Sequence, residues 1–431
     1  DPKVLFLRSD GHWTLPRVRL KGDVWAGNAD VLVPAFAKRL GSRPWIYRQI
    51  RIAADRETKR IEGIFEMIMT SSGWEPPRNS RWVDRSSLET LRVKEERFRL
   101  LVDRYLSDLE RGEVPTERPP WCADGWLSGV RSWIEEELTR LGHVLLDLEQ
   151  VKQWSISSVL RVKTDGPDFY FKASIDVPLF VNEAVVTDRL SRRFPAYIPG
   201  PIAVDPARAW MLLPDFGELV PETSGVEVRR QLFERFCELQ RASANWIMDL
   251  LADGCIDRRL HVLESQIDPL LNDEGAMSAI TEHERDRLRT LAPALKELTR
   301  EMANLDVPYT LVHSDLHLAN TARVDGVLTF FDWTDACVAH PFVDLMALKF
   351  ETDDNEKQSI MDAYLAGWHE VATPEALQRA VLLASVLIPL HHAVSYQQLL
   401  VNLEPAARPE LDATGGFLRR VIASADALKA E

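Results

Sequence analysis

Two aspartates and one asparagine lie close together between residues 311 and 335, which read LVHSDLHLAN and then TARVDGVLTFFDWTD. Asp315 and Asn320 stand five residues apart in a polar segment. The Asp-Gly pair at 325–326 predicts a tight turn, and the short apolar strand after that turn ends at Asp332. The pattern therefore predicts two carboxylates and one carboxamide on adjacent loops of a single hairpin.

Such a set of side chains suits phosphoryl transfer from ATP. One carboxylate accepts the proton of the attacking hydroxyl, while an Asn and a second Asp hold Mg²⁺ against the phosphates. Mg²⁺ prefers a few hard oxygen ligands and fills its other positions with water and phosphate. We therefore predict Asp315 as the catalytic residue and Asn320 and Asp332 as the metal ligands. The simpler interpretation is two solvated loop acids and a capping asparagine.

The spacing Asp-Leu-x-x-x-Asn matches the catalytic loop of protein kinases, but the surrounding residues differ. Ser314 stands where protein kinases have Arg, and no Ala-Pro-Glu follows. The chain resembles instead the aminoglycoside phosphotransferase family of small-molecule kinases, over roughly residues 145–400. The residues that carry this resemblance are, in order, His313, Asp315, Asn320, Asp332-Trp333 and Asp344-Leu345.

The resemblance implies a two-lobed, protein-kinase-like fold and ATP-dependent transfer to the hydroxyl of a small molecule. An aminoglycoside, an amino sugar or another sugar-like metabolite would be such an acceptor, and choline-like alcohols and homoserine-like metabolites are the alternatives. The signature does not identify the acceptor, because its residues serve ATP and metal. The alternative is a pseudokinase that binds nucleotide and acts as a scaffold or regulator through the N-terminal domain.

Lys172 lies in an alternating strand, FYFKAS, where an ammonium on a half-buried face needs a partner. The kinase layout gives such a lysine the α- and β-phosphates and a glutamate of the next helix. Pro178 is predicted to open that helix, and Glu183 lies on it. The neighbouring Asn182 is neutral and cannot balance the charge. The alternative for Lys172 is a surface lysine whose charged end reaches solvent.

Two further segments are predicted to contact the nucleotide. Residues 154–158 (WSISS) stand where a phosphate-covering loop belongs, and they contain no glycine. Ser157 and Ser158 are predicted to offer donors to phosphate. The stretch LPDFG at 213–217 is interpreted as the hinge, whose backbone holds adenine in this family. Because the proline there has no N–H, we expect Asp215 or Phe216 to supply the donor.

Acceptor specificity is predicted to lie between the last helices and the loop of Asp315. Adjacent histidines diverge on a helix, so the His-His pair at 391–392 does not predict a metal site, and buried histidines are the alternative. The polar and aromatic candidates are Asp335, Trp368, His391, His392 and Tyr396.

Residues 1–112 resemble a Nudix domain in the order of their elements. A strand and a Trp-x-Leu-Pro segment precede a helix over 31–41, two long strands over 46–54 and 62–69, and Arg-Trp-Val. The Nudix catalytic helix carries metal-binding glutamates, but their positions here hold other residues, so no Mg²⁺ cage can form. Those residues are Pro34, Ala35, Lys38 and Arg39.

We therefore predict a degenerate, non-hydrolytic module that serves docking, dimerisation or closure. The alternative is an unrelated α+β domain. Ser86 and Glu89 have the spacing of a capping box, which predicts the start of one helix that reaches Gly112.

The composition fits a globular chain of two or three domains, with 431 residues, 45% hydrophobic and 27% charged residues. The net charge of −14 argues against nucleic-acid binding. Four scattered cysteines indicate free thiols in a reducing cytoplasm. We expect no signal peptide, and the richest apolar run, 380–390, is shorter than the roughly 18 residues of a membrane span.

The predicted fold class is α+β, with a two-lobed kinase-like fold preceded by a small α/β Nudix-like domain. The expected partners are ATP, Mg²⁺ and a small-molecule hydroxyl acceptor, with no nucleic acid or membrane, and a homodimer could form through the N-terminal domain. The expected domains are 1–112 (Nudix-like), 113–143 (Pro-rich linker and connecting helix), 144–217 (kinase N-lobe and hinge) and 218–431 (helical C-lobe).

Overall fold

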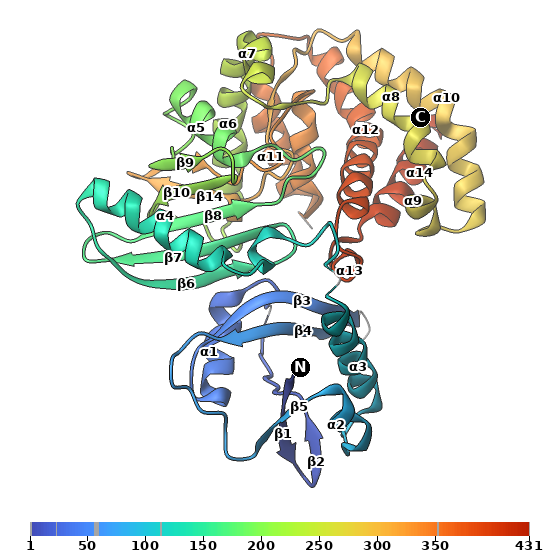
Figure 1. Ribbon diagram of the computed structural model, residues 1–431. Helices are drawn as coiled ribbons and strands as arrows, with labels where there is room; N and C mark the ends of the chain where they lie inside the picture. Colours follow the sequence, from blue (N-terminus) through green and yellow to red (C-terminus); the bar gives the residue numbers. More distant parts are fainter. Residues whose placement is uncertain (1, 23, 56–59, 113, 351–352, 431) are drawn as a thin grey trace. The chain divides into compact units, whose positions relative to one another are not determined.

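The computed structural model describes residues 2–22, 24–55, 60–112, 114–350 and 353–430 (Figure 1). The chain divides into two compact units, which are described separately. The first unit comprises Asp1–Gly166 with Leu403–Glu410, and the second comprises Pro167–Asn402 with Leu411–Glu431. The domain boundaries drawn from the sequence stay predictions.

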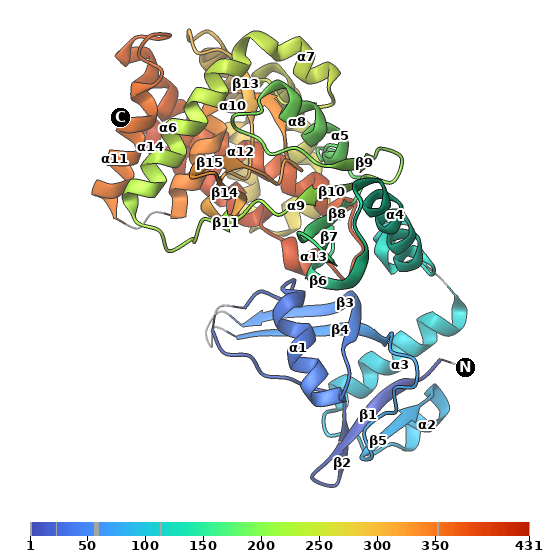
Figure 2. The same cartoon turned by 90° about the vertical axis from the view of Figure 1, so that its left-hand side faces the viewer.

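The first unit begins with strands β1 (Val4–Ser9) and β2 (His12–Thr14), which form a three-stranded antiparallel sheet with β5 (Ser80–Val83). Helix α1 (Ala29–Leu40) follows and ends at Gly41, whose positive φ of 78° suits glycine. Strands β3 (Pro44–Asp55) and β4 (Arg60–Met69) then form a long antiparallel hairpin beside α1 (Figure 2). This order of elements is the expected one, while the likeness to a Nudix domain and the homodimer stay predictions.

The predicted capping box at Ser86 and Glu89 is wrong. Asp84 is the N-cap of α2 (Arg85–Thr90), and its Oδ1 accepts the backbone N–H of Ser87 at 2.8 Å. A carboxylate two residues earlier therefore satisfies the free N–H groups. The chain leaves the helix at Leu91, and a separate helix, α3 (Glu96–Arg111), ends at Gly112.

The rest of the first unit is built on the β3–β4 hairpin. It contains η1 (Pro120–Cys122), α4 (Trp126–Leu141) and the antiparallel strands β6 (Leu145–Gln153) and β7 (Ser157–Thr164). The side chain of Gln150 on β6 exchanges two hydrogen bonds of 2.8 Å with the backbone of Ile46 on β3. The N-terminal elements and the β6–β7 hairpin therefore pack as one body.

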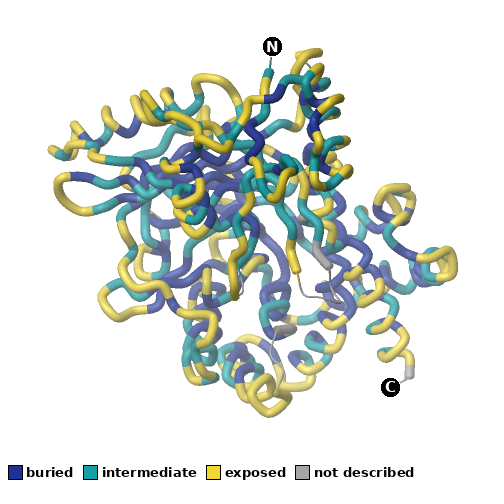
Figure 3. The backbone as a smooth tube through the Cα atoms, turned by 90° about the horizontal axis from the view of Figure 1, so that it is seen from below, coloured by how far each residue is buried: buried dark blue, intermediate teal, exposed yellow. Residues whose placement is uncertain are grey.

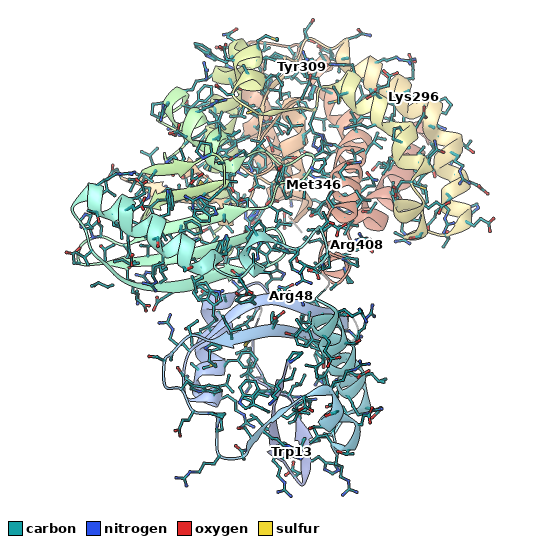
Figure 4. All side chains as sticks on the ribbon, in the orientation of Figure 1. Trp13, Arg48, Lys296, Tyr309, Met346 and Arg408 are labelled. Atoms are coloured by element: carbon teal, nitrogen blue, oxygen red, sulfur yellow. The ribbon has the colours of Figure 1, made fainter. Side chains whose placement is uncertain are left out.

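A largely buried group of four charges, which we call the arginine cluster, also lies in the first unit. Arg118 donates to both carboxylate oxygens of Glu404 at 2.9 Å, and Arg48 contacts the same Glu404 at 2.9 Å. Arg48 also donates to Glu66 at 2.6 Å. Figure 4 labels Arg48 on β3 and Arg408 on the 403–410 segment. The cluster thus fixes a segment from near the C-terminus to β3.

The second unit starts with three antiparallel strands, β8 (Phe169–Ser174), β10 (Trp210–Pro214) and β9 (Ala203–Asp205), with β10 in the middle. Helix α5 (Glu183–Arg193) begins later than predicted, because Asn182 and not Pro178 provides its cap. The Asn182 side chain accepts the N–H of Val185 at 3.3 Å. Glu183 is therefore the first residue of the helix.

Helices make up most of the second unit, as the periodicity predicted. In Figure 1, α8, α10, α12 and α14 lie side by side. Figure 3 colours the backbone by burial and shows buried residues toward the interior and exposed residues toward the outside. The bounds are α6 (Val226–Ser243), η2 (Ala244–Trp246), α7 (Ile247–Ala252), α8 (Leu260–Asn272), α9 (Glu274–Ser278), α10 (Glu282–Ala303), η4 (Pro341–Phe350), α11 (Asp354–Ala366), α12 (Pro374–Val401), α13 (Arg408–Leu411, shared with the first unit) and α14 (Thr414–Ala430).

Helix α12 is long and apolar enough to cross a membrane by length and composition alone, although the unbroken apolar run in it is short. Within its most apolar window, however, 72% is buried inside the protein. This burial is typical of the core helix of a globular protein, so the test gives only weak evidence for a span.

Short strands carry the loops that the sequence singled out. Strand β13 (Thr310–Val312) lies between the helices and pairs with β16 (Cys337–Ala339), which also pairs with β12 (Ile256–Asp257). The loop of Asp315 follows β13 and leads through η3 (Leu318–Asn320) into the hairpin of β14 (Thr321–Val324) and β15 (Val327–Phe330), with β11 (Glu218–Leu219) beside β14. Asp332 follows directly after this hairpin, as predicted.

Candidate active site

The structure brings Lys172, Glu183 and Asp332 together from a strand, a helix and a loop. The ammonium of Lys172 lies 2.7 Å from Glu183 Oε1 and 2.7 Å from Asp332 Oδ1. The Lys172 side chain is only 9% exposed and that of Glu183 only 2%. Burial alone would lower the pKa of Lys172, but the charges of Asp332 and Glu183 outweigh it and raise this pKa, so the ammonium keeps its proton.

Two hydroxyl groups complete this lysine cluster, and sequence reasoning did not identify either of them. Ser174 donates to Glu183 Oε2 at 2.8 Å. Thr334 lies 3.0 Å from the same Glu183 oxygen and 3.0 Å from Asp332 Oδ1. Thr334 is only two residues after Asp332, and this nearness to a predicted metal ligand was the sequence signal that could have identified it. Glu183 is held rigidly and in turn holds Lys172.

Asp315 and Asn320 lie side by side in the loop after β13. The amide nitrogen of Asn320 donates to the backbone oxygen of Asp315 at 2.9 Å and to its carboxylate Oδ2 at 3.2 Å. The Asp315 side chain is 61% exposed. Desolvation alone would raise the pKa of Asp315, but the hydrogen bond and the charge of His317 lower this pKa by more. The pKa of Asp315 is therefore below its ordinary value, and the carboxylate is ionised at neutral pH.

Backbone contacts join the Asp315 loop to the Asp332 loop. The N–H of Phe331 donates to the backbone oxygen of Asn320 at 3.1 Å. The ring of His313 lies 2.9 Å, through Nε2, from the backbone oxygen of Phe331. Together with the Lys172–Asp332 ion pair, these contacts bring the predicted catalytic residue, the predicted metal ligands and Lys172 to one place in the second unit.

Asp344 anchors the backbone of the Asp315 loop. Its buried carboxylate accepts the N–H groups of His313 at 3.2 Å and Ser314 at 2.7 Å, and the amide of Gln240 at 3.0 Å. Ser314 has a positive φ of 68°, and Asp332 has one of 65°. Such strained backbone persists only where the surroundings fix it, and it often occurs at functional sites.

The amide and carboxylate oxygens present fit a magnesium site. The Asn320 nitrogen is used by Asp315, and no described residue donates to Asn320 Oδ1, which leaves that oxygen for a cation. Among the described residues, no group of three or more His, Cys, Asp or Glu has the arrangement of a metal site. Asn320 and Asp332 would therefore supply the protein ligands, and water and phosphate the others.

The predicted hinge connects β10 to β11. The carboxylate of Asp215 accepts the N–H of Gly217 at 2.9 Å. The ring of Phe216 lies 5.4 Å from the ring of Phe331, which precedes Asp332. The hinge thus packs against the loop of a predicted metal ligand, while the contact of Asp215 and Phe216 with adenine stays a prediction.

The serines predicted to contact phosphate lie in the first unit, where their hydroxyls already have protein partners. Ser158 is fully buried and donates to Gln153 Oε1 at 2.7 Å. Ser157 Oγ accepts the indole N–H of Trp154 at 2.6 Å. A role for Ser157 and Ser158 in phosphate binding stays a prediction.

The acceptor candidates divide into two groups. Trp368 is fully buried, His391 contacts Ser314 Oγ at 3.2 Å inside the protein, and the His392 ring stacks 5.3 Å from Phe417. These three are core residues, so His391 and His392 are the buried histidines that the sequence left as the alternative. Asp335 and Tyr396 remain partly exposed.

Asp335 is also electrostatically coupled to the predicted site. The pKa of Asp335 is raised by burial and by the charges of Asp315 and Asp332. The pKa of Tyr396 is raised by burial and by the charges of Asp315 and Asp335. Asp335 and Tyr396 therefore lie within electrostatic reach of Asp315, where an acceptor would bind.

Comparisons with known proteins agree with this geometry. No curated protein sequence matches the chain. An ethanolamine kinase of Plasmodium vivax has the same kinase-like fold, with a TM-score of 0.50, 12% identity, and coverage of 80% of this chain and 99% of that chain.

Two other solved structures are similar at lower scores. A choline kinase of Streptococcus pneumoniae has a TM-score of 0.47, 13% identity, and coverage of 70% of this chain and 100% of that chain. A macrolide 2'-phosphotransferase of Brachybacterium faecium has a TM-score of 0.46, 19% identity, and coverage of 66% of this chain and 97% of that chain. Residues 182–379, which include every predicted catalytic and metal-binding residue, match the model of the phosphotransferase enzyme family.

Proposed function

We propose that this phosphotransferase moves the γ-phosphoryl group of ATP to the hydroxyl of a small molecule in a Mg²⁺-dependent reaction. One observation carries the proposal. The ammonium of Lys172 lies between Glu183 and Asp332, while the exposed carboxylate of Asp315 lies beside Asn320 on the adjoining loop. A phosphate-binding cation, a metal-binding pair and a base are thus assembled in one place.

Each side chain then has a defined task. Asp315 accepts a hydrogen bond from the acceptor hydroxyl, orients it toward the γ-phosphorus and takes its proton. Lys172 binds the α- and β-phosphate oxygens, and Glu183 holds its ammonium in place. Asn320 and Asp332 would hold Mg²⁺, which when bound neutralises the charge that develops on the phosphate oxygens.

The proposed acceptor is an aminoglycoside, an amino sugar or another sugar-like metabolite. The ionised, exposed carboxylate of Asp315 leaves negative charge where the acceptor would bind, and such charge favours an amine-bearing molecule. Similar solved structures include kinases of choline and ethanolamine and a spectinomycin phosphotransferase, so these compounds belong in an acceptor panel. Four free cysteines support a cytoplasmic location.

The test is release of ADP from Mg·ATP in the presence of choline, ethanolamine, spectinomycin, glucosamine and glucose. The Asp315→Asn variant should lose about 10²- to 10⁴-fold in turnover, because a general base contributes that much. Its melting temperature should not change, since the side chain is largely exposed.

Asp325→Asn is the matched control, because Asp325 is an exposed turn residue with φ of 51° that Asn also adopts readily. Turnover of Asp315→Asn equal to that of Asp325→Asn would refute the assignment. ATP binding by the wild type without phosphorylation of any acceptor, as measured by mass spectrometry, would favour the scaffold alternative.

A further inference from the structure

We propose that Glu222 and His317 are positioning residues that fix the orientation of the Asp315 carboxylate. This inference rests on the proposed function, in which Asp315 receives the proton of the acceptor. Neither Glu222 nor His317 belongs to the set of residues that the sequence pattern selected.

The first observation is a chain of three side chains that leads to Asp315. Glu222 Oε1 lies 2.9 Å from Nδ1 of His317. The other ring nitrogen of His317, Nε2, forms an ion pair with Asp315 Oδ2 at 3.4 Å. Both nitrogens of the ring thus face carboxylate oxygens, which fixes the plane of the imidazole relative to Asp315.

The second observation is that Glu222 also holds the backbone of the loop. The same Oε1 accepts the N–H of Ala319 at 3.1 Å, two residues after His317. The backbone of Glu222 is itself anchored, because Arg229 on α6 donates to its carbonyl oxygen at 2.7 Å. A carboxylate from a segment 95 residues earlier is therefore held against the catalytic loop.

The third observation is how the two oxygens of Asp315 are used. Oδ2 is contacted by His317 and by the amide of Asn320, at 3.4 and 3.2 Å. No described residue donates to Oδ1. Because the side chain is 61% exposed, packing does not select its rotamer, and the two donors on Oδ2 must do so. Oδ1 is then directed to the position of the acceptor hydroxyl.

This arrangement affects the chemical step more than nucleotide binding. A base displaced by about 1 Å can cost about 10²-fold in rate, since the reacting atoms no longer align. Neither Glu222 nor His317 is in contact with Lys172 or Glu183 in the described structure, and His317 contacts the proposed metal ligand Asn320 only through its backbone oxygen, at 3.0 Å. Affinity for Mg·ATP should therefore change much less than kcat.

The experiment uses the full chain with His317→Phe and Glu222→Ala. We expect His317→Phe to lower kcat by about 100-fold and Glu222→Ala by about tenfold, using the best acceptor of the panel above. KM for ATP should stay within twofold. His317→Gln should recover most of the rate, because its amide can still donate to Asp315. A merely structural role would instead lower the folded fraction and would not be rescued in this way.

Two exposed residues provide matched controls. Glu218→Ala removes a carboxylate four residues before Glu222, and His369→Phe removes an exposed imidazole after α11. Both should keep the wild-type kcat. If the wild type is active and His317→Phe and Glu222→Ala both keep its kcat, the proposal is overturned.

A second readout does not depend on activity. Crystal structures of the wild type and of His317→Phe should show one orientation of the Asp315 carboxylate in the former and a different or divided orientation in the latter. If the Asp315 carboxylate has the same single orientation in the wild type and in His317→Phe, the proposal is overturned, whatever the kinetics. If the wild type transfers phosphate to no acceptor and releases no ADP, the proposed function fails, while the carboxylate orientations still decide the positioning role.

Discussion

The lysine cluster of the second unit and the arginine cluster of the first unit both bury charges, but they balance them differently. In the lysine cluster one ammonium faces two carboxylates, Glu183 and Asp332. In the arginine cluster two guanidinium groups face two carboxylates, Glu66 and Glu404. The first therefore keeps an excess negative charge, and the second is neutral.

This difference in net charge is the one expected between the proposed cation-binding site and a purely structural group of ion pairs. Buried charges cost free energy unless opposite charges and hydrogen bonds compensate for them. The bidentate contacts of Arg118 with Glu404 use both carboxylate oxygens, as a structural pair would. Asp332, by contrast, is 27% exposed and lies beside Asp315 and Asn320, so the uncompensated charge faces the proposed metal position.

Among the variants that test this comparison, the largest expected effect is that of Lys172→Met. Without the ammonium, the phosphates lose a charged donor, and turnover of ATP should fall by about 10²- to 10³-fold. Glu183, which is only 2% exposed, would also lose its partner, so the free energy of unfolding should fall by about 3–5 kcal/mol. Urea denaturation and ADP release on the same preparation measure both effects.

Glu183→Gln, combined with Lys172→Met, is the control for the stability part of that prediction. A neutral amide needs no counter-ion, so the double variant should regain much of the stability and none of the turnover. Recovery of turnover in the double variant would remove Lys172 from the proposed mechanism.

Arg48→Met should have a comparable effect on stability and a much smaller one on catalysis. Arg48 is 12% exposed and contacts both carboxylates of its cluster, so its loss should lower the free energy of unfolding by about 3–5 kcal/mol. The turnover of the folded fraction, measured well below the melting temperature, should stay within twofold. A tenfold fall in that turnover would show that the two clusters do not differ in the way inferred from their charges.

Thr334→Val tests the hydroxyl that contacts both carboxylates of the lysine cluster. The substitution keeps the shape and removes a buried hydrogen bond, so we expect a loss of about 1–2 kcal/mol in unfolding free energy. Turnover should fall by about tenfold, because Asp332 and Glu183 lose a common support. That fold-change corresponds to about 1.4 kcal/mol in the activation barrier.

Thr329→Val is the matched control for this variant. Thr329 is also buried, and its hydroxyl donates only to the backbone oxygen of Ala322 at 3.3 Å. It should lose stability and keep its turnover. Equal turnover in the two threonine variants would contradict a supporting role for Thr334.

The contrast between the clusters also shows what the sequence could and could not predict. The helix predicted over 31–41 is present as α1, which spans Ala29–Leu40, because apolar spacing and end signals are local properties of the chain. The pairing of Lys172 with Glu183 was predictable because kinase spacing places them on a strand and the next helix. The capping box at Ser86 was wrong because Asp84 competes for the same N–H groups.

Contacts between distant segments left no such signal. Glu404 and Arg48 are 356 residues apart, and neither lies in a motif. Glu222 and His317 are 95 residues apart, and Glu222 stands in an irregular segment. Only the tertiary fold decides that these side chains meet, so the arginine cluster and the support of Asp315 became visible in the structure alone.

The smallest expected effect is that of Arg97→Met on the surface of the first unit. Arg97 donates to both oxygens of Glu62 at 2.8 Å, which is the same paired geometry as that of Arg118 and Glu404. The Arg97 side chain is, however, 51% exposed, so water replaces the lost partner and Glu62 keeps its charge at little cost. The free energy of unfolding, measured by urea denaturation, should fall by less than about 1 kcal/mol. A loss as large as that of Arg48→Met would mean that hydrogen-bond geometry, and not burial, determines how much these ion pairs stabilise the protein.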